Sequence, residues 1–244
     1  MNQTNKQDAP VAFISGAAKR IGAVIAEHLH DAGFRIMIHC HRSIELAKKM
    51  AQSMNQRRPN SANFVTSNLY DTTKIDHLIT KTVDWAGRLD LLVNNASIFS
   101  RDAEKWDELF TIHVKAPYLL STAAFPYLYQ TQGSIINITD IHAEQPLKDY
   151  SVYCQSKAAL LMQTKSLARE YAPNVRVNAV APGSIIWPEE DNQLTEDQQQ
   201  LIINKTPLKR HGNPTFIAQA VSALVDNPFI TGQTLRVDGG RSLG

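Results

Sequence analysis

The sequence predicts a single α/β domain in which helices cover both faces of a doubly wound parallel sheet. Three observations favour this fold class. Short runs rich in β-branched residues recur along the chain. Most of these runs are apolar at every position, as strands covered on both faces are, and longer amphipathic stretches separate them. The alternation continues from residue 9 to residue 244 without a linker or a repeat, so we expect one domain with its ligand beyond the carboxyl ends of the strands.

Seven runs are expected to form the strands of this sheet. They are VAFIS (11–15), RIMIHC (35–40), ANFVTS (62–67), LDLLVNN (89–95), SIINIT (134–139), VRVNAVA (175–181) and QTLRVD (233–238). The stretch RIGAVIAEHLHDAG, residues 20–33, is typical of the helices between them. One of its sides carries apolar residues and one histidine at helical spacing, and Gly33 is expected to end the helix. The residues of that side are Ile21, Val24, Ile25, His28 and Leu29.

The composition excludes several classes of protein. The chain is 43% hydrophobic and 20% charged with a net charge of +2, and it has no run of Lys or Arg that would indicate nucleic-acid binding. Two cysteines, Cys40 and Cys154, give no disulfide framework, which fits a reducing compartment. Residues 1–8 are expected to form a flexible tail, and no apolar run approaches the roughly 18–20 residues of a membrane span. A cytoplasmic protein with no membrane, nucleic-acid or metal partner is therefore expected.

The segment 184–213 departs from the alternation of strands and helices. It is polar, contains the acidic run PEED at 188–191, and carries a helix start at Thr195, where Gln198 can complete a capping box. Because the segment follows the end of a predicted strand, it could fold over the ligand cleft as a substrate lid. It could equally be an excursion on the surface, and both interpretations stay open.

The first strand and helix are joined by a turn that suits a phosphate. Gly16 follows the strand directly and Gly22 lies six residues further on. Such a turn lets backbone N–H groups and the start of the helix face an anion. Lys19 and Arg20 stand where the dinucleotide fingerprint usually has a further glycine. A purely structural turn between strand and helix would show the same pattern.

The second strand ends in a basic and polar cluster, His41, Arg42 and Ser43. A chain that binds NAD carries an acidic residue at this point, which accepts hydrogen bonds from the adenosine ribose. No acidic residue is present here, whereas a guanidinium pairs well with a 2′-phosphate through charge-assisted hydrogen bonds. With Arg20 nearby, the cluster favours NADPH as the cofactor. The alternative is a solvated basic strand end.

The predicted helix near residue 150 carries a candidate acid–base group. Tyr153 and Lys157 are four residues apart and therefore share one face of a helix. A free phenol has a pKa of about 10, and a neighbouring ammonium lowers it toward the range that general catalysis needs. Asp140 stands at the end of the preceding strand, where it could hold a substrate and pass a proton through Tyr153. As isolated features, these residues could also be an ordinary helix face and a turn.

Together, these motifs resemble the short-chain dehydrogenase/reductase family. The set comprises Gly16 with Gly22, NNA from Asn94, Tyr153-x-x-x-Lys157, and PG at 182–183. The resemblance implies a Rossmann-type sheet of seven parallel strands, a homotetramer or a dimer with the homotetramer favoured, and hydride transfer to or from a nicotinamide. It also implies that Tyr153 is the proton donor and that Lys157 binds the nicotinamide ribose. The cofactor-binding residues that it implies are Gly16, Arg20, Ile21, His41, Arg42, Ser43, Asn68, Leu69, Asn95, Ala96, Ser97, Lys157, Pro182, Gly183 and Ser184.

Departures from the usual family pattern are similar to those of the pteridine reductases and the bacterial dihydromonapterin reductases. Asp140 stands in place of the usual serine, Ser97 replaces the glycine after NNA, and Arg20 replaces the central fingerprint glycine. The shared runs include GAAKRIG, HCHRS, NNASIF, DIHAEQPLKDYSVY and IHVKAPYLL. This resemblance implies that Phe99 stacks a flat bicyclic ring against the nicotinamide. Ser97, Asp140 and Tyr153 would then form hydrogen bonds with the ring.

The activity implied by this branch is NADPH-dependent reduction of a dihydropterin to its tetrahydro form, with Asp140, Tyr153 and Lys157 as the catalytic residues. Dihydrobiopterin and dihydromonapterin are the candidate substrates, and dihydrofolate is a further one. The alternatives are a carbonyl reductase for a substrate such as a 3-oxoacyl thioester, and a non-catalytic NADPH-binding sensor. His113 takes the position of a family asparagine that anchors a water in a proton relay. The sequence leaves open whether an imidazole serves that relay.

Overall fold

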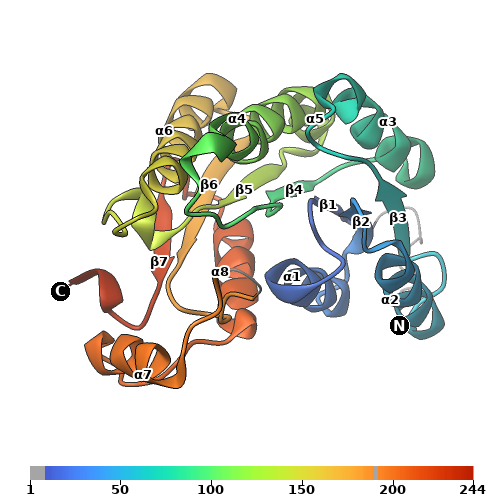
Figure 1. The fold of residues 1–244 in the computed structure, drawn as a ribbon. Coiled ribbons are helices and arrows are strands. Elements are labelled where there is room, and N and C mark those ends of the chain that lie inside the picture. Colours follow the sequence, from blue (N-terminus) through green and yellow to red (C-terminus); the bar gives the residue numbers. More distant parts are fainter. Residues whose placement is uncertain (1–8, 190–191, 244) are drawn as a thin grey trace.

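The computed structural model describes residues 9–189 and 192–243, so the predicted tail 1–8 lies outside the described residues. It contains one sheet of seven strands in the order β3-β2-β1-β4-β5-β6-β7, and all neighbouring strands are parallel. This confirms the predicted fold class (Figure 1). The strands are β1 (Val11–Ile14), β2 (Arg35–Cys40), β3 (Ala62–Thr66), β4 (Leu91–Asn94), β5 (Ser134–Ile138), β6 (Arg176–Pro182) and β7 (Thr234–Val237).

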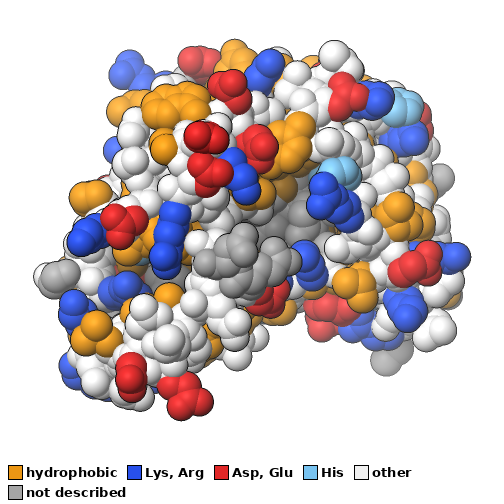
Figure 2. Space-filling model, viewed as in Figure 1, with side chains coloured by type: hydrophobic (Ala, Val, Ile, Leu, Met, Phe, Trp, Pro, Cys, Tyr) orange, Lys and Arg blue, Asp and Glu red, His pale blue; other side chains and the backbone are white. Residues whose placement is uncertain are grey.

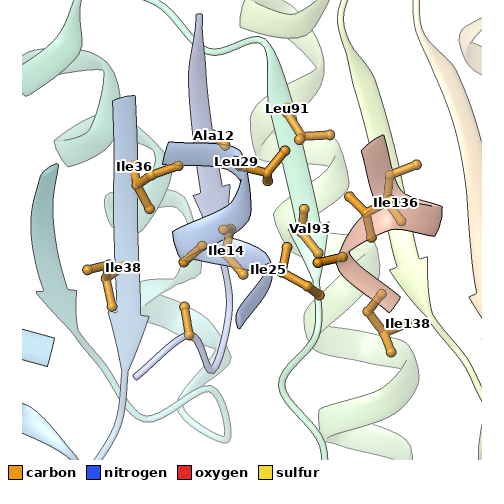
Figure 3. Packing of buried hydrophobic residues seen from close by; sticks show 14 of the residues in the cluster. Ala12, Ile14, Ile25, Leu29, Ile36, Ile38, Leu91, Val93, Ile136 and Ile138 are labelled. Atoms are coloured by element: carbon orange, nitrogen blue, oxygen red, sulfur yellow. The ribbon is translucent and has the colours of Figure 1, made fainter. Parts of the chain in front are cut away.

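Helices cover both faces of the sheet (Figure 1). The strands alternate their side chains between the two faces, so that Ala12 and Ile14 join one core cluster while Val11 and Phe13 join the other. Figure 3 shows the first cluster, which lies between the sheet and helices α1, α2 and α8. The second cluster lies under α3, α5 and α6. The helices are α1 (Arg20–Asp31), α2 (Ile44–Arg57), α3 (Ile75–Ala86), α4 (Trp106–Phe110), α5 (Ala116–Thr131), α6 (Ser151–Tyr171), α7 (Glu196–Lys205) and α8 (Pro214–Asp226).

The strand order places a crevice at the carboxyl ends of β1 and β4. The chain leaves β1 toward β2 on one side, and it returns to β4 on the other side. At such a switch point the two outgoing connections diverge, which opens a space for a ligand. Figure 2, drawn in the same view as Figure 1, shows Lys, Arg and His side chains on this face of the molecule.

The segment after β6 begins its helix where the sequence predicts. The Thr195 hydroxyl accepts a hydrogen bond from the Gln198 N–H at 3.3 Å, and the Gln198 side chain accepts one from the Thr195 N–H at 2.9 Å. This reciprocal capping box starts α7. Within the described ranges no helix is long and apolar enough to cross a membrane. The same ranges contain no group of three or more His, Cys, Asp and Glu side chains arranged to hold a metal ion.

Candidate active site

The turn between β1 and α1 packs tightly against the loop that follows β4. Gly16 has a left-handed φ of +64°, and a Cβ on Gly22 would lie 2.5 Å from the Asn95 side-chain nitrogen. That nitrogen donates to the carbonyl oxygens of Ser15 and Gly16 at 2.9 and 3.1 Å. Glycine is therefore required at both positions by backbone conformation and by close approach. Asn95, which was expected to flank a cofactor, holds the turn itself in place.

His39 fixes the same turn from the side of β2, and no sequence motif predicted this role. Its Nδ1 accepts a hydrogen bond from the Gly16 N–H at 3.2 Å, so its Nε2 carries the proton and donates to the Ser67 carbonyl at 3.1 Å. Burial lowers the pKa of His39 to about 4, which keeps the ring neutral. The available signal was a histidine inside an otherwise apolar strand, where a side chain must find buried partners.

Arg20 occupies the first position of α1 with a left-handed backbone. Its φ is +56°, a conformation that costs a residue other than glycine about 1–2 kcal/mol. Arg20, which stands where the fingerprint usually has its central glycine, therefore adopts a backbone conformation that favours glycine. The guanidinium lies 2.7 Å from the Glu189 carboxylate and donates to the Trp187 carbonyl at 3.2 Å. Arg20 therefore connects the start of α1 to the segment 184–213.

The remaining residues that were expected to bind the adenosine half of the cofactor lie after the ends of β2 and β3. His41 and Arg42 are exposed directly after β2, and Ser43 stands at the N-cap of α2. Asn68 is exposed after β3, and its side-chain oxygen accepts from the Tyr70 N–H at 3.1 Å. The Leu69 side chain is buried in the second core cluster, so only its backbone is left to meet a ligand.

The structure brings Asp140 and Tyr153 together. The Tyr153 hydroxyl donates to Asp140 Oδ2 at 2.7 Å. The other carboxylate oxygen of Asp140 accepts from the His142 N–H at 2.8 Å and caps the short turn after β5. The capping and the functional interpretations of Asp140 are thus compatible, because each uses a different oxygen. Lys157 is buried on the same helix, where its Nζ donates to the Ile138 carbonyl at 3.1 Å.

The pKa of Tyr153 differs from the sequence-based expectation. It is raised well above its ordinary value by burial first, and then by the neighbouring Asp140 carboxylate. The Lys157 ammonium was expected to lower it, but its Nζ lies 5.8 Å from the centre of the Tyr153 ring. Burial also lowers the pKa of Lys157 to about 8. Tyr153 therefore stays protonated at neutral pH, and its proton lies in the bond to Asp140.

An aromatic cluster borders this pair. The Phe99 ring stacks on the Tyr150 ring with their centroids 4.4 Å apart, and it meets the Tyr153 ring edge-on at 4.9 Å. The Tyr150 hydroxyl accepts from the Arg101 guanidinium at 2.8 Å and donates to the Asn192 side chain at 2.9 Å. One face of Phe99 is therefore already covered by Tyr150.

The segment 184–213 reaches the same cluster. The Asn192 side-chain nitrogen donates to the Phe99 carbonyl at 2.9 Å, and the Asn192 oxygen accepts from Tyr150. Together with the contacts of Arg20, these bonds join the segment to the start of α1, the loop after β4 and the start of α6. Residues 190 and 191, part of the acidic PEED run, lie outside the described residues.

Comparison with known proteins decides the family. Residues 16–242 match a family model described as enoyl-(acyl carrier protein) reductase. The chain belongs to the short-chain dehydrogenase/reductase family. It is therefore an oxidoreductase, and its sheet is the Rossmann-type sheet of that family.

Three relatives of this short-chain reductase show the range of its similarities. The granaticin polyketide synthase putative ketoacyl reductase 2 of Streptomyces violaceoruber is 32% identical over 98% of this chain and 99% of its own length. Pteridine reductase 1 of Leishmania tarentolae is also 32% identical, with the same coverage. The crystal structure of alternative dihydrofolate reductase 1 from Brucella suis in complex with NADP superposes with a TM-score of 0.89. It is 32% identical and covers 98% of this chain and 97% of its own.

The carboxyl end of β6 supplies the last predicted residues of this short-chain reductase. Pro182 ends the strand, and the Gly183 N–H donates to the Val237 carbonyl at 3.0 Å. A Cβ on Gly183 would lie 2.6 Å from Asp238, so the glycine permits this close approach. Beside Ser184 a cavity of about 550 Å³ opens between the segment 184–213 and the end of β7 with the residues that follow it, and neither Asp140 nor Tyr153 lines it.

Proposed function

We propose that this short-chain reductase uses NADPH to reduce a dihydropterin to its tetrahydro form. The observation that carries the proposal is the hydrogen bond of 2.7 Å between Tyr153 and Asp140, with the Phe99 ring packed against Tyr153. A carboxylate beside the proton donor suits a ring that presents N–H and amino groups, since it can accept hydrogen bonds from them. A planar ring also suits an aromatic border.

The hydrogen-bond donors at the ends of β1 and β2 suit the phosphate groups of NADPH. The first-turn N–H groups of α1 lack intrahelical acceptors and suit a pyrophosphate. The sequence from His41 to Ser43 offers an exposed guanidinium and a hydroxyl but no carboxylate, which suits a 2′-phosphate. We assign the rest of the cofactor site to the other residues that the family resemblance implies, namely Arg20, Ile21, Asn68, Leu69, Ala96, Ser97 and residues 182–184. When bound, NADPH supplies the hydride.

The chain's own residues supply the proton that reduction of a C=N bond requires at nitrogen. Because the pKa of Tyr153 is raised, the phenol is protonated at neutral pH, and its O–H turns from Asp140 to give its proton to the ring nitrogen. Asp140 orients the phenol and accepts from the ring's N–H groups. Lys157 holds the nicotinamide ribose through its ammonium. Phe99 and the segment 184–213, acting as a lid, exclude water from the ring.

Relatives support two substrate classes, and the site favours one of them. Pteridine reductase 1 and the alternative dihydrofolate reductase support a pterin or dihydrofolate, whereas the ketoacyl reductase supports a 3-oxoacyl thioester. Asp140 offers an acceptor where a carbonyl substrate needs a donor, so the thioester is the second candidate. A non-catalytic NADPH sensor ranks last, because Tyr153 and Lys157 are both intact. Assembly as a cytoplasmic homotetramer remains part of the proposal.

Oxidation of NADPH distinguishes these functions. The purified protein is assayed with 7,8-dihydrobiopterin, 7,8-dihydromonapterin, dihydrofolate and acetoacetyl thioester side by side. We expect turnover with at least one dihydropterin and faster turnover with NADPH than with NADH. Turnover of the thioester alone would identify the second candidate instead. Tight NADPH binding without reduction of any substrate would identify a sensor.

Removal of the Tyr153 hydroxyl tests the proton donor. Tyr153→Phe is expected to lower kcat for the dihydropterin by about 10²–10⁴-fold, the usual contribution of a positioned acid. Binding of NADPH, followed by the change in its fluorescence, should persist. Tyr129→Phe, a change in an exposed tyrosine of α5, serves as the control. Retention of full activity by Tyr153→Phe would contradict the assignment.

A further inference from the structure

His113 is a buried imidazole that the proposed reaction does not use directly. It lies in the π-helical turn Thr111–Lys115 between α4 and α5, and only 1% of its surface is exposed. Its Nδ1 is 2.8 Å from the Ser156 hydroxyl, and its Nε2 is 2.7 Å from the Ser97 hydroxyl. The imidazole therefore joins the loop after β4 to helix α6, which carries Tyr153.

The hydrogen bonds around Ser156 assign the proton on the imidazole. The Ser156 hydroxyl donates its one proton to the Tyr153 carbonyl at 2.7 Å. The backbone N–H of Ile98 donates to Nε2 at 3.4 Å, so Nε2 is the acceptor nitrogen, Nδ1 carries the proton, and the Ser156 oxygen accepts from it. Burial, and then the nearby Lys157 ammonium, lower the pKa of His113 well below its ordinary value. The ring is consequently neutral, and its Nε2 carries a lone pair.

This lone pair determines the direction of the bond to Ser97. Two groups point their protons toward Nε2: the Ser97 hydroxyl at 2.7 Å and the Ile98 N–H at 3.4 Å. The other acceptor near the Ser97 hydroxyl is the Ile98 carbonyl at 3.3 Å, and the shorter bond to Nε2 is the better one. The Ser97 hydroxyl therefore donates its proton to His113 Nε2 and has none left to donate to a ligand. Ser97 is exposed, so its oxygen is left to accept from a ligand.

We propose that His113 is a positioning residue that makes Ser97 a hydrogen-bond acceptor toward the substrate, so that the site selects a ring with an amino group there over a ring with a carbonyl oxygen. The inference rests on the proposed function and deepens it. A carbonyl oxygen facing the Ser97 oxygen would leave two acceptors opposed and unpaired. An amino group in the same place donates to Ser97 and satisfies both.

Paired ligands that differ at this one group test the selection. The protein saturated with NADP⁺ is titrated in a calorimeter with 7,8-dihydrobiopterin and with the corresponding lumazine, in which a carbonyl oxygen replaces the 2-amino group. We expect the pterin to bind at least about tenfold more tightly, as an unpaired buried polar group would cause. Ser97→Ala should remove most of this preference, and His77→Asn, a change in an exposed histidine of α3, should leave it intact. Equal affinities in the unmodified protein would overturn the inference.

A change at Ser156 separates positioning from simple structural support. Ser156→Ala removes the acceptor of the Nδ1 proton, so the proton can move to Nε2 and Ser97 can turn to donate outward. We expect the preference for the pterin over the lumazine to fall by about tenfold, with the lumazine binding more tightly. Ser156→Thr keeps the hydroxyl and should restore the preference. A uniform loss of affinity for both ligands would indicate a structural role only and would contradict the proposal.

The tautomer itself can be observed without any substrate. Nitrogen-15 NMR of the histidine-labelled protein should show His113 protonated at Nδ1 alone between about pH 5.5 and 8, a range in which an exposed histidine titrates. Protonation at Nε2 would overturn the inference, whatever the substrate is. If His113 is protonated at Nδ1 but the pterin and the lumazine bind with equal affinity, the inference about Ser97 is overturned. The assignment of the protein as a reductase then still stands. Reduction of the thioester alone would instead contradict the proposed function.

Discussion

At the scale of single residues, the site is organised around a buried ammonium. Lys157 is 2% exposed and its Nζ donates to the Ile138 carbonyl. Taking an ammonium out of water disfavours its charged form, and the pKa of Lys157 is accordingly lowered to about 8. The folded protein therefore bears a cost for carrying this charge at neutral pH.

Replacement of this lysine by an uncharged residue should stabilise the fold and remove the enzymatic activity. At pH 7 Lys157→Met is expected to raise the free energy of unfolding by on the order of 1–3 kcal/mol and to abolish efficient turnover. The folded pKa of about 8 lies below the unfolded one, so the unfolded chain binds more protons between the two values. The stability of the unmodified protein therefore rises from about pH 8 upward, and the difference between the proteins shrinks there.

Urea denaturation at several pH values measures this difference. Lys165→Met, a change in an exposed lysine of the same helix, should alter stability little at any pH. A variant Lys157→Met that is less stable than the unmodified protein at pH 7 would show that the interactions of the ammonium outweigh its desolvation.

The sequence predicted the residues with local signatures and missed those whose partners are distant. Tyr153 and Lys157 follow from helical spacing, and Asp140 follows from its place after a strand. His39 and His113 act through contacts with residues that are between 15 and 43 positions away in the chain. Only the fold shows which nitrogen of each ring carries the proton. The direction of the Tyr153 pKa shift was also missed, because it depends on burial.

At the scale of elements, the seven strands could be predicted because a covered parallel sheet leaves long apolar runs. The start of β4 was the main difference. It begins at Leu91, two residues after the predicted start, because the Asp90 carboxylate accepts from the Val11 N–H at 2.8 Å and pairs with Arg88. The π-helical turn around His113 was not predicted, since an extra residue within one helical turn leaves no distinct period in the sequence.

The end of β2 is the element that should distinguish the two nicotinamide cofactors. Arg42 is exposed there, and charge-assisted hydrogen bonds to a phosphate are worth about 1.5–3 kcal/mol. Arg42→Ala is therefore expected to raise KM for NADPH by about tenfold or more while KM for NADH stays nearly constant. Steady-state kinetics with both cofactors measures the effect.

Lys48→Ala, which removes an exposed positive charge from α2, is the matched control for that measurement. It should leave both KM values nearly unchanged. An Arg42→Ala variant that weakens NADPH and NADH equally would show that Arg42 supports the fold of the site rather than the 2′-phosphate.

At the scale of the whole molecule, the segment 184–213 connects parts of the chain that are far apart in sequence. It contacts the start of α1 through Glu189 and Trp187. It contacts the loop after β4 and the start of α6 through Asn192. The capping box at Thr195 predicted its helix, but these contacts involve distant residues and left no local signature.

Removal of the Asn192 side chain should loosen this segment. Asn192→Ala loses the bonds to Phe99 and Tyr150, each worth about 1 kcal/mol. We expect cleavage within 184–213 by a non-specific protease to become faster by about fivefold or more, and KM for the dihydropterin to rise. Mass spectrometry of timed digests locates the cuts. Gln193→Ala, at the exposed neighbouring position, should leave the rate unchanged, and an equal rate in Asn192→Ala would argue against a lid.

The position of β1 and β4 at the centre of the sheet order has a consequence for redesign. Coenzyme choice is assigned to the half that contains β2 and β3, whereas substrate chemistry is assigned to the half that contains β5 and β6. Substitutions at the end of β2 and at the ends of β5 and β6 lie in opposite halves of the sheet order, so their free energies should add. A version that uses NADH and a version that accepts a different ring could then be developed separately and combined in one polypeptide.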